Sequence, residues 1–256
     1  TMPYVAMDIT DAKAVEENIT NLKPDVVVHC AAWTAVDLAE DEDKQAIVHA
    51  INAGGTENIA KMCKELNCKM VYISTDYVFD GQGTEPWEPD CKDYAPLNVY
   101  GQTKLDGELA VSGNLDKYFI VRIAWVFGKN GKNFIKTMLN VGKTHDKLTV
   151  VNDQIGTPTY ANDLAQAIFA AINKGVVRGI YHFSDEGVCS WYDFTIAIHR
   201  LAGIASCKVK PLHTADYPAK APRPHYSVLD KTKIKTTFGI EIPHWEESLK
   251  RCIDTL

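Results

Sequence analysis

The sequence predicts an α/β fold in which helices cover a parallel sheet. Short apolar runs rich in β-branched residues alternate with segments whose apolar residues recur at helical spacing. The clearest runs are Val26-Val-Val-His29, Lys69 to Ser74 and Phe119 to Ala124. Alternation of this kind leads by default to a parallel sheet, and ligands of such sheets bind at the carboxyl ends of the strands.

The composition is that of a globular chain with one large domain or one and a half. Of the 256 residues, 46% are hydrophobic, and no uncharged apolar run reaches the roughly 18 residues that span a bilayer. The net charge of −6 and the lack of a long basic run argue against a nucleic-acid partner. Because the start has no signal-peptide pattern, we expect a cytoplasmic protein without a membrane partner.

Cysteine and histidine spacing predicts neither a disulfide framework nor a metal site. The seven cysteines are odd in number and contain no Cys-x-x-Cys pair, which favours a reducing cytoplasm. Cys30 ends an apolar strand and is interpreted as a buried small hydrophobe. The eight histidines form no His-x-x-x-His or His-Glu-x-x-His set, so a zinc site has little support.

Two strands and a helix are expected near the start of the chain. Tyr4 to Met7 is a short apolar run, and Thr10 or Asp11 can cap the helix that follows it. Pro24 then breaks the chain before Val26-Val-Val-His29. This run of β-branched residues predicts a strand that is buried on both faces.

A long segment of helical period runs from about Asp43 to Leu66. Its apolar residues recur on one side, but Gly54-Gly55 interrupts it. Two glycines in the middle of a helix are costly, so we expect another part of the chain to pack closely against them.

The stretch Asn98-Val-Tyr-Gly-Gln-Thr-Lys104 places Tyr100 and Lys104 four residues apart. On a helix that spacing puts both side chains on one face. A free tyrosine has a pKa of about 10, and a nearby positive charge is expected to lower the pKa of Tyr100 towards the working range of a proton donor. The long loop from Thr75 to Leu97 precedes the pair, and loops of this length are uncommon unless they are functional. The spacing alone is also that of an exposed tyrosine beside a solvated lysine.

The second half of the chain has a less regular pattern, typical of a smaller lobe packed against the sheet. A proline-rich segment, Tyr217 to Pro224, precedes its last helix. The predicted helices are Phe134 to Gly142, Asn162 to Asn173, Trp191 to Leu201 and about Glu246 to Ile253, and the predicted strands are Leu148 to Val151 and Ile180 to Phe183.

Two segments of the chain carry a resemblance to a known family: Ser74-Thr-Asp-Tyr-Val-Phe79 and Pro96-Leu-Asn-Val-Tyr-Gly-Gln-Thr-Lys104. They resemble the extended short-chain dehydrogenase/reductases, and most closely the dTDP-4-dehydrorhamnose reductase family. Further segments are similar in order and spacing: Ala31-Ala-Trp-Thr-Ala-Val-Asp37, Asn133-Phe-Ile-Lys-Thr-Met138, Val151-Asn-Asp-Gln-Ile-Gly-Thr-Pro158, Trp191-Tyr-Asp193 and Arg223-Pro224. So many ordered segments are far more specific than the Tyr-x-x-x-Lys pair alone.

This resemblance implies a Rossmann-like doubly wound parallel sheet with a smaller C-terminal substrate-binding lobe. Residues 1–133 would form the dinucleotide-binding domain, with 149–183 partly contributing, and 134–256 would form mainly the lobe. The implied activity is the NAD(P)H-dependent reduction of the C4 keto group of dTDP-4-dehydro-L-rhamnose to dTDP-L-rhamnose. Relatives include monomers and metal-linked dimers, so a homodimer with Mg²⁺ at its interface stays open.

The same resemblance implies roles for individual residues. Tyr100 would protonate the C4 oxygen, and Lys104 would hold the nicotinamide ribose and lower the pKa of Tyr100. Thr75 would hydrogen-bond the same oxygen. The further cofactor-binding positions would be Asp8, Ile9, Ala31, Ala32, Thr34 and Ile73, and the further substrate-binding positions would be Val36, Asp76, Trp125 and Arg223. The residues themselves leave alternatives open: Thr75 or Asp76 as a turn cap, Trp125 as plain core, and Arg223 as a surface residue.

The opening unit of the family is expected before Tyr4 and is not recognisable in this sequence. That unit is a strand, a Gly-x-x-Gly-x-x-Gly turn, a helix and a second strand, and its glycine turn lets backbone N–H groups approach the cofactor pyrophosphate. Gly54-Gly55 lies inside a helix and cannot replace it. We therefore expect the sequence to be a trimmed form of a longer protein, and the 256-residue chain alone to bind the dinucleotide poorly. The choice between NADH and NADPH is not readable here.

Two other functions fit the same pattern. One is a different nucleotide-sugar reductase, epimerase or dehydratase of the same fold, although the neighbours of Thr75 suit a dehydratase less well. The other is a non-catalytic regulatory subunit that resembles the methionine adenosyltransferase beta subunit, because a fold and its site can outlive an activity. Dependence on a catalytic partner chain would distinguish the second from an enzyme.

Overall fold

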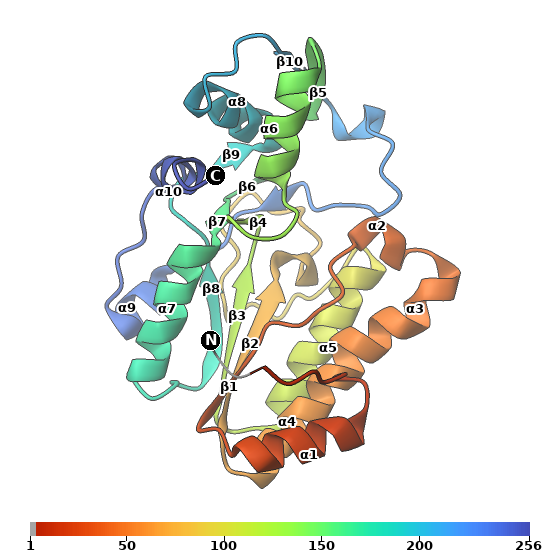
Figure 1. Cartoon of the computed structure of the whole chain (residues 1–256), viewed down its shortest axis with the longest axis vertical. Coiled ribbons are helices and arrows are strands. Elements are labelled where there is room, and N and C mark those ends of the chain that lie inside the picture. The colour runs from red at the N-terminus through yellow and green to blue at the C-terminus, as the bar shows by residue number, and fades with distance from the viewer. Residues whose placement is uncertain (1–3) are drawn as a thin grey trace.

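A four-stranded parallel sheet lies at the centre of the computed structural model, which describes residues 4–256 (Figure 1). The strand order is β1-β2-β3-β8, and every neighbouring pair is parallel. The strands are β1 (Val26–His29), β2 (Lys69–Thr75), β3 (Tyr118–Ile123) and β8 (Gly179–Phe183). The predicted α/β fold with a parallel sheet is therefore confirmed.

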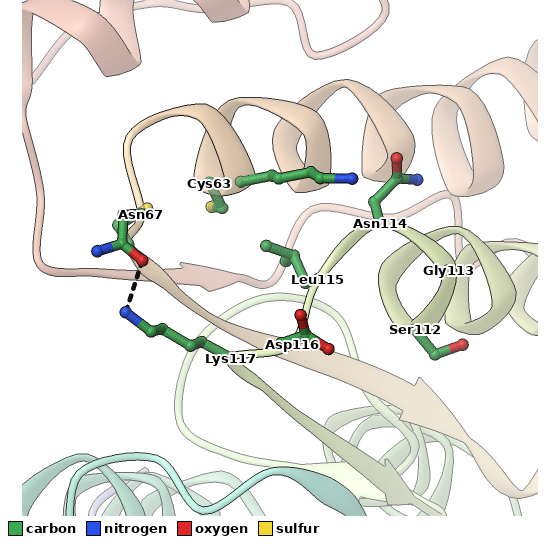
Figure 2. Close-up of a pocket in the computed structure, with 10 residues that line it drawn as sticks. Cys63, Asn67, Ser112, Gly113, Asn114, Leu115, Asp116 and Lys117 are labelled. Atoms are coloured by element: carbon green, nitrogen blue, oxygen red, sulfur yellow. Dashed lines mark hydrogen bonds between the residues drawn. The ribbon is translucent and has the colours of Figure 1, made fainter.

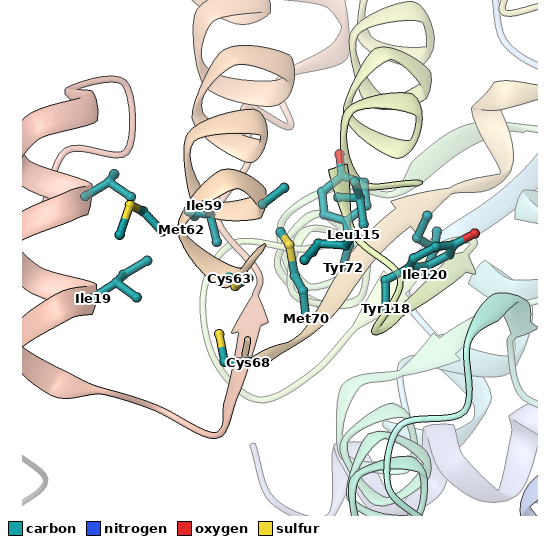
Figure 3. Close-up of a cluster of buried hydrophobic side chains, with 13 residues drawn as sticks. Ile19, Ile59, Met62, Cys63, Cys68, Met70, Tyr72, Leu115, Tyr118 and Ile120 are labelled. Atoms are coloured by element: carbon teal, nitrogen blue, oxygen red, sulfur yellow. The ribbon is translucent and has the colours of Figure 1, made fainter. Parts of the chain in front are cut away.

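Helices cover both faces of this sheet. On one face, α1 (Ala12–Leu22), α4 (Thr56–Glu65) and α5 (Val99–Asn114) enclose an apolar cluster that includes Met70 and Tyr72 of β2 (Figure 3). On the other face, α7 (Ala161–Asn173) and α9 (Thr232–Phe238) pack on neighbouring side chains of β2 and β3. Side chains alternate between the faces of a strand, so one apolar run supplies both cores.

The glycine pair lies in the middle of one long helical rod. Helix α3 (Glu42–His49) continues through a π-helical turn, Ala50–Gly55, into α4. A Cβ atom at Gly55 would lie 2.6 Å from Cγ1 of Ile9, so the N-terminal segment packs directly on the rod. The predicted close approach is confirmed at this glycine, and the missing side chain is what allows it.

A smaller lobe lies above the carboxyl ends of the strands (Figure 1). Its helices are α6 (Phe134–Thr144), α8 (Trp191–Leu201) and α10 (Trp245–Ile253), and they share a core centred on the fully buried Phe194. The lobe contains the pair β5 (Lys147–Val151) and β10 (Lys208–Leu212), and the small sheet β11 (Tyr226–Ser227), β6 (Ile155–Gly156) and β9 (Cys189–Ser190). The pair β4 (Val126–Phe127) and β7 (Thr159–Tyr160) connects the lobe to the main sheet, and the short α2 (Val36–Ala39) follows β1.

Side chains cap the starts of α1 and α8, and the cap of α1 is one of the two residues predicted for it. The Asp11 side chain accepts from the backbone N–H groups of Lys13 and Ala14 at 3.0 and 3.2 Å, so it caps α1. Ser190 and Asp193 form a reciprocal capping box at the start of α8. Asp193 therefore has a structural role at this helix start.

Three sequence-based expectations at the start of the chain are wrong. Tyr4 to Met7 is not a strand, because in the described chain it has no neighbouring strand to pair with. Val28 of β1 is 41% exposed rather than buried on both faces, because β1 is an edge strand of the sheet. Cys30 is exposed, since the chain leaves the sheet directly after His29. Within residues 4–256, no helix is both long and apolar enough to cross a membrane.

Candidate active site

Tyr100 and Lys104 lie on the first turns of α5, next to the carboxyl end of β2. Asn98 caps the helix, with its side chain accepting from the Gly101 N–H at 2.8 Å. A Cβ atom at Gly101 would lie 2.4 Å from the backbone oxygen of Tyr77, so the helix start presses on the 3₁₀ turn that follows β2. This close approach places Tyr100 beside Thr75.

A cavity of about 570 Å³ opens at this edge of the sheet. Its walls come from the ends of β1, β2 and β3, from the starts of α5 and α7, and from the lobe. Nine of the predicted site residues line it: Ala32, Thr34, Val36, Ile73, Thr75, Asp76, Tyr100, Lys104 and Trp125. The carboxyl edge of a parallel sheet is where the fold predicts a ligand site.

Four predicted residues lie outside this cavity. Asp8 is occupied locally, because its carboxylate accepts from the backbone N–H and the hydroxyl of Thr10 at 2.9 and 2.8 Å. Ile9 packs on the glycine of the α3–α4 rod, and Ala31 is exposed beyond β1. Arg223 lines a neighbouring cavity instead.

Lys104 is buried, and its ammonium lies at the floor of the cavity. Its side chain is 3% exposed, and Nζ donates to the backbone oxygen of Ile73 at 2.7 Å. Nζ also lies 4.1 Å from the centre of the Tyr72 ring. Burial lowers the pKa of Lys104 to about 7, against the attraction of the Glu108 carboxylate.

The Lys104 ammonium suits a group with several hydroxyls. An ammonium has three donors, and the hydrogen bonds of the described chain use one of them, to the Ile73 carbonyl. The two others can reach a ligand in the cavity, as a cofactor ribose would require. The residues present therefore fit a nicotinamide cofactor at this point.

The phenol of Tyr100 carries its proton at neutral pH. Burial raises the pKa of Tyr100 to about 12, the hydrogen bond with Thr75 lowers the pKa, and the Asp76 charge raises it. The expected lowering of this pKa by Lys104 is wrong for the structure. The ammonium is directed at the Ile73 carbonyl, and burial of the phenol outweighs the favourable contacts.

Asp76 combines a structural role with an unused acceptor. The Thr75 hydroxyl donates to Asp76 Oδ1 at 3.1 Å and accepts from the Tyr77 N–H at 3.3 Å, so Thr75 also caps the turn. Burial raises the pKa of Asp76 to about 6, and the Ser227 hydroxyl opposes this shift. Oδ2 of Asp76 is buried without a hydrogen-bond partner in residues 4–256. A buried acceptor of this kind is expected to take a donor from a ligand.

Trp125 forms part of an aromatic wall that the sequence pattern did not reveal. Its ring stacks on Trp191 with centroids 3.7 Å apart, and its backbone is in the left-handed region at φ 50°. A Cβ atom at Gly156 would lie 2.8 Å from the Trp125 ring. Trp191 lines the same cavity; the sequence places it at the start of a helix and in a segment of the family resemblance, and predicts no role for it in the site. Two aromatic rings from distant segments meet here, and no local spacing signals such a contact.

The neighbouring cavity has a volume of about 350 Å³ and lies within the lobe. Trp191 lines both cavities, so they share a wall. The smaller one is mostly apolar, and Arg223 is its single charged residue. An apolar cavity with a guanidinium at its edge suits a flat ring that carries phosphate.

A third hollow, of about 270 Å³, lies at the opposite edge of the sheet (Figure 2). It is formed where α4 and α5 end, and Lys117 donates to Asn67 at 2.6 Å across its rim. None of the predicted site residues lines it. Within residues 4–256, no group of three His, Cys, Asp or Glu side chains could hold a metal ion.

Comparison with known proteins agrees with this geometry. A family model described as the RmlD substrate binding domain matches residues 2–256. The chain belongs to this family. A similar curated RmlD-family protein is the dTDP-4-dehydrorhamnose reductase of Escherichia coli K12, which is 42% identical over 97% of this chain and 85% of that protein. SpsK of Bacillus subtilis, a spore coat polysaccharide biosynthesis protein, is 40% identical over 95% of this chain and 84% of that protein.

Solved structures of proteins named dTDP-4-dehydrorhamnose reductase are similar over most of the chain. A dTDP-4-dehydrorhamnose reductase from Clostridium acetobutylicum has a TM-score of 0.92 and 45% identity, over 96% of this chain and 86% of that one. The Bacillus anthracis reductase, crystallised in complex with NADP, has a TM-score of 0.93 and 39% identity, over 98% and 87% of the two chains. The doubly wound fold therefore agrees with these relatives as well as with the sequence.

Proposed function

We propose that this protein reduces the C4 keto group of dTDP-4-dehydro-L-rhamnose to dTDP-L-rhamnose with NADPH or NADH. The observation that carries the proposal is the convergence of Thr75, Tyr100 and Lys104 on one cavity at the carboxyl edge of the sheet. The relatives named as reductases of this substrate, and the relative that holds NADP, support it.

Each residue of the trio has a role that its surroundings support. A bound nicotinamide supplies the hydride for the keto carbon. Tyr100 donates its proton to the C4 oxygen, and a pKa of about 12 keeps that proton in place until the oxygen gains charge. Thr75 lies beside the same phenol, and with substrate bound its single hydroxyl proton turns from Asp76 Oδ1 to the C4 oxygen as a second hydrogen-bond donor. Lys104 holds the ribose hydroxyls with the donors left by Ile73.

The remaining site residues divide between the two ligands. Ala32, Thr34 and Ile73 form the cofactor side of the cavity, while Val36, Asp76 and Trp125 form the substrate side. Asp76 supplies an acceptor for a sugar hydroxyl through its unpartnered oxygen. Arg223 contacts the substrate diphosphate from the neighbouring cavity. In the same proposal Asp8, Ile9 and Ala31 flank the adenosine end of the cofactor, outside the cavity.

The proposed division of the chain follows these roles. Residues 1–133, with part of 149–183, hold the dinucleotide, and 134–256 hold mainly the nucleotide sugar. The protein works as a monomer or homodimer in the cytoplasm.

The experiment is a turnover assay with the purified full-length protein and dTDP-4-dehydro-L-rhamnose. Loss of the nicotinamide absorbance is followed with NADPH and with NADH, and the product sugar nucleotide is identified by chromatography against dTDP-L-rhamnose. Turnover with either cofactor and the expected product supports the proposal. A folded protein that turns over neither cofactor, and acts only with a separate catalytic chain, would point to the regulatory-subunit alternative.

A further inference from the structure

The proline-rich segment between β10 and β11 crosses to the sheet side of the molecule and is attached there at several points. We use the term strap for residues 220–223. Lys220 pairs with Asp41, and the Ala221 N–H donates to Asp37 Oδ1 at 3.0 Å. Asn98 Nδ2 donates to the backbone oxygen of Pro222 at 2.8 Å. The strap is therefore tied to α2, to the start of α3 and to the start of α5.

Asn98 links the strap to the catalytic helix with one side chain. Its oxygen caps α5 by accepting from the Gly101 N–H, while its amide nitrogen holds the strap. Tyr100 lies in the helix turn that this hydrogen bond closes, between Asn98 and Gly101 in the sequence. The position of the strap is thus fixed relative to the phenol, although the two are more than a hundred residues apart in the sequence.

The two terminal nitrogens of the Arg223 guanidinium are hydrogen-bonded within the described chain. Nη1 and Nη2 donate to the two oxygens of Asp37 at 3.1 and 2.7 Å, and Nη1 also donates to the backbone oxygen of Ala221 at 3.1 Å. A guanidinium has five N–H donors. The hydrogen bonds of the described chain use three, which leaves Nε–H and one Nη2–H on the side edge.

That side edge is a two-pronged donor of the kind that binds phosphate oxygens in pairs. Arg223 lines the lobe cavity, whose apolar wall is shared with the reacting cavity through Trp191. A nucleoside diphosphate that spans the two cavities would pass this edge. The Asp37 carboxylate lies on the other edge, where it holds the fork in one orientation.

We propose that Asp37 is a positioning residue for the substrate. It fixes the Arg223 guanidinium so that the free edge meets one phosphate of the nucleoside diphosphate. This inference rests on the proposed function, because it takes the substrate to be a nucleoside diphosphate sugar. Asp37 touches neither the sugar nor the reacting atoms, so its effect is on binding of the phosphate.

Binding of dTDP and of thymidine to the cofactor-free protein tests the proposal by isothermal titration calorimetry. Asp37→Asn keeps the shape of the side chain and removes the charge that holds Arg223. We expect the Kd for dTDP to rise by about tenfold, the range of one charge-assisted hydrogen bond. The Kd for thymidine, which has no phosphate, should stay within twofold. Asp41→Asn is the matched control, because Asp41 pairs with the same strap through Lys220 and does not contact Arg223.

A double-mutant comparison separates positioning from a general structural effect. In an Arg223→Lys background the fork is absent, so Asp37→Asn should add less than twofold to the Kd for dTDP. In turnover, Asp37→Asn should raise KM for the dTDP sugar by about tenfold and leave kcat within twofold. Thermal melting checks that the half-exposed Asp37 position tolerates the change. Arg223→Lys alone should also raise the Kd for dTDP by about tenfold.

Several results would overturn the inference. Unchanged dTDP binding in Asp37→Asn would mean that the carboxylate does not position Arg223 for the phosphate. Tighter binding would mean that the carboxylate competes with the phosphate for Arg223. An equal loss for thymidine, or the same loss in the Arg223→Lys background, would assign Asp37 a structural role. A protein that binds dTDP as expected but reduces no substrate would contradict the proposed function and leave the positioning role standing.

Discussion

Helix α5 carries two polar groups only one turn apart, and they differ in how completely they are hydrogen-bonded. Tyr100 and Lys104 form the upper group at the cavity. Glu108 forms the lower group with Arg122 of β3, and both of these side chains are almost fully buried. The comparison is informative because Lys104 and Glu108 lie on adjacent turns of the same helix and both are buried.

The lower group is satisfied by the protein itself. Arg122 donates from Nε and Nη2 to the two oxygens of Glu108 at 2.9 and 2.7 Å, and Nη2 also donates to the Tyr94 hydroxyl at 3.2 Å. Ser74 donates to the same carboxylate at 2.5 Å. The ring of Phe79 lies 5.0 Å from the guanidinium. Nearly every polar atom here has a partner, as buried ion pairs require.

The upper group keeps its chemistry available. Lys104 has a single acceptor in the described chain, and Asp76, which lines the same cavity, keeps one oxygen without a partner there. Buried polar groups are normally paired, so the incomplete pairing of these side chains distinguishes the upper group from the lower one. The lower group is hydrogen-bonded within the fold, and the proposed function assigns the upper group to ligands.

Tyr100→Phe should have the largest effect and should separate the two groups most clearly. Loss of the proton donor is expected to lower kcat by about a thousandfold, within the range of general acid catalysis, and to change the unfolding free energy by less than about 1 kcal/mol. Steady-state kinetics and urea denaturation measure both. Tyr94→Phe is the matched control, since its hydroxyl serves Arg122: it should lose about 1 kcal/mol of stability and keep kcat within threefold. A loss of kcat below tenfold in Tyr100→Phe would remove its acid role.

Arg122→Met tests the lower group. It leaves the Glu108 carboxylate buried without its cation, and removal of one partner of a buried pair costs about 3–5 kcal/mol of unfolding free energy. Urea denaturation measures the loss. The double variant Arg122→Met with Glu108→Gln should recover part of it, because no unpaired charge remains. A single variant as stable as the parent would contradict the structural role of this pair.

Alanine substitutions at two glycines of α5 should change the unfolding free energy by smaller amounts and in opposite directions. A Cβ atom at Gly101 would meet the Tyr77 backbone oxygen at 2.4 Å, so Gly101→Ala should cost about 1–3 kcal/mol and displace Tyr100. Gly113 has no atom within 4 Å of the same position, and Gly113→Ala should stabilise the helix by about 0.5–1 kcal/mol. Thermal melting and kcat of both variants decide the matter. Equal behaviour of the two would show that the close contact does not constrain the helix start.

The pH profile should show the smallest effect. The pKa of Lys104 is about 7, so kcat/KM is expected to fall as pH rises through this value and the ammonium loses its proton. The Glu108 carboxylate favours the charged ammonium, so Glu108→Gln should lower the pKa of Lys104 and move the falling limb to lower pH. Profiles from pH 5.5 to 9, about the range over which such a group titrates, test the direction. A limb that stays in place or moves upward would exclude coupling through Glu108.

The main helices and strands follow from local pattern, while the site depends partly on contacts that no local pattern contains. The sequence predicts helices at α1, α5 and α8, and for α1 it also predicts the capping residue, Asp11, as one of two candidates. The segment Tyr4 to Met7 has the composition of a strand and still needs a neighbouring strand, which the described chain does not place beside it. A strand forms only when a second strand pairs with it, so the sequence of one segment is not sufficient to predict a strand.

The site shows the same limit. Thr75, Tyr100 and Lys104 are close in sequence and resemble a known motif, so they could be predicted. The partner of Arg223 is Asp37, which is 186 residues away and belongs to a four-residue helix that the periodicity did not indicate. The pKa of Tyr100 also depends on burial, which sequence spacing does not measure.

The stacked indoles of Trp125 and Trp191 give the protein an optical signal of its own. Two parallel chromophores whose centres lie 3.7 Å apart couple electronically, and the coupling depends steeply on their separation and angle. One of the two rings belongs to both cavities, so a ligand that moves it changes the light the protein absorbs and emits. Occupancy of the site becomes visible without any added label.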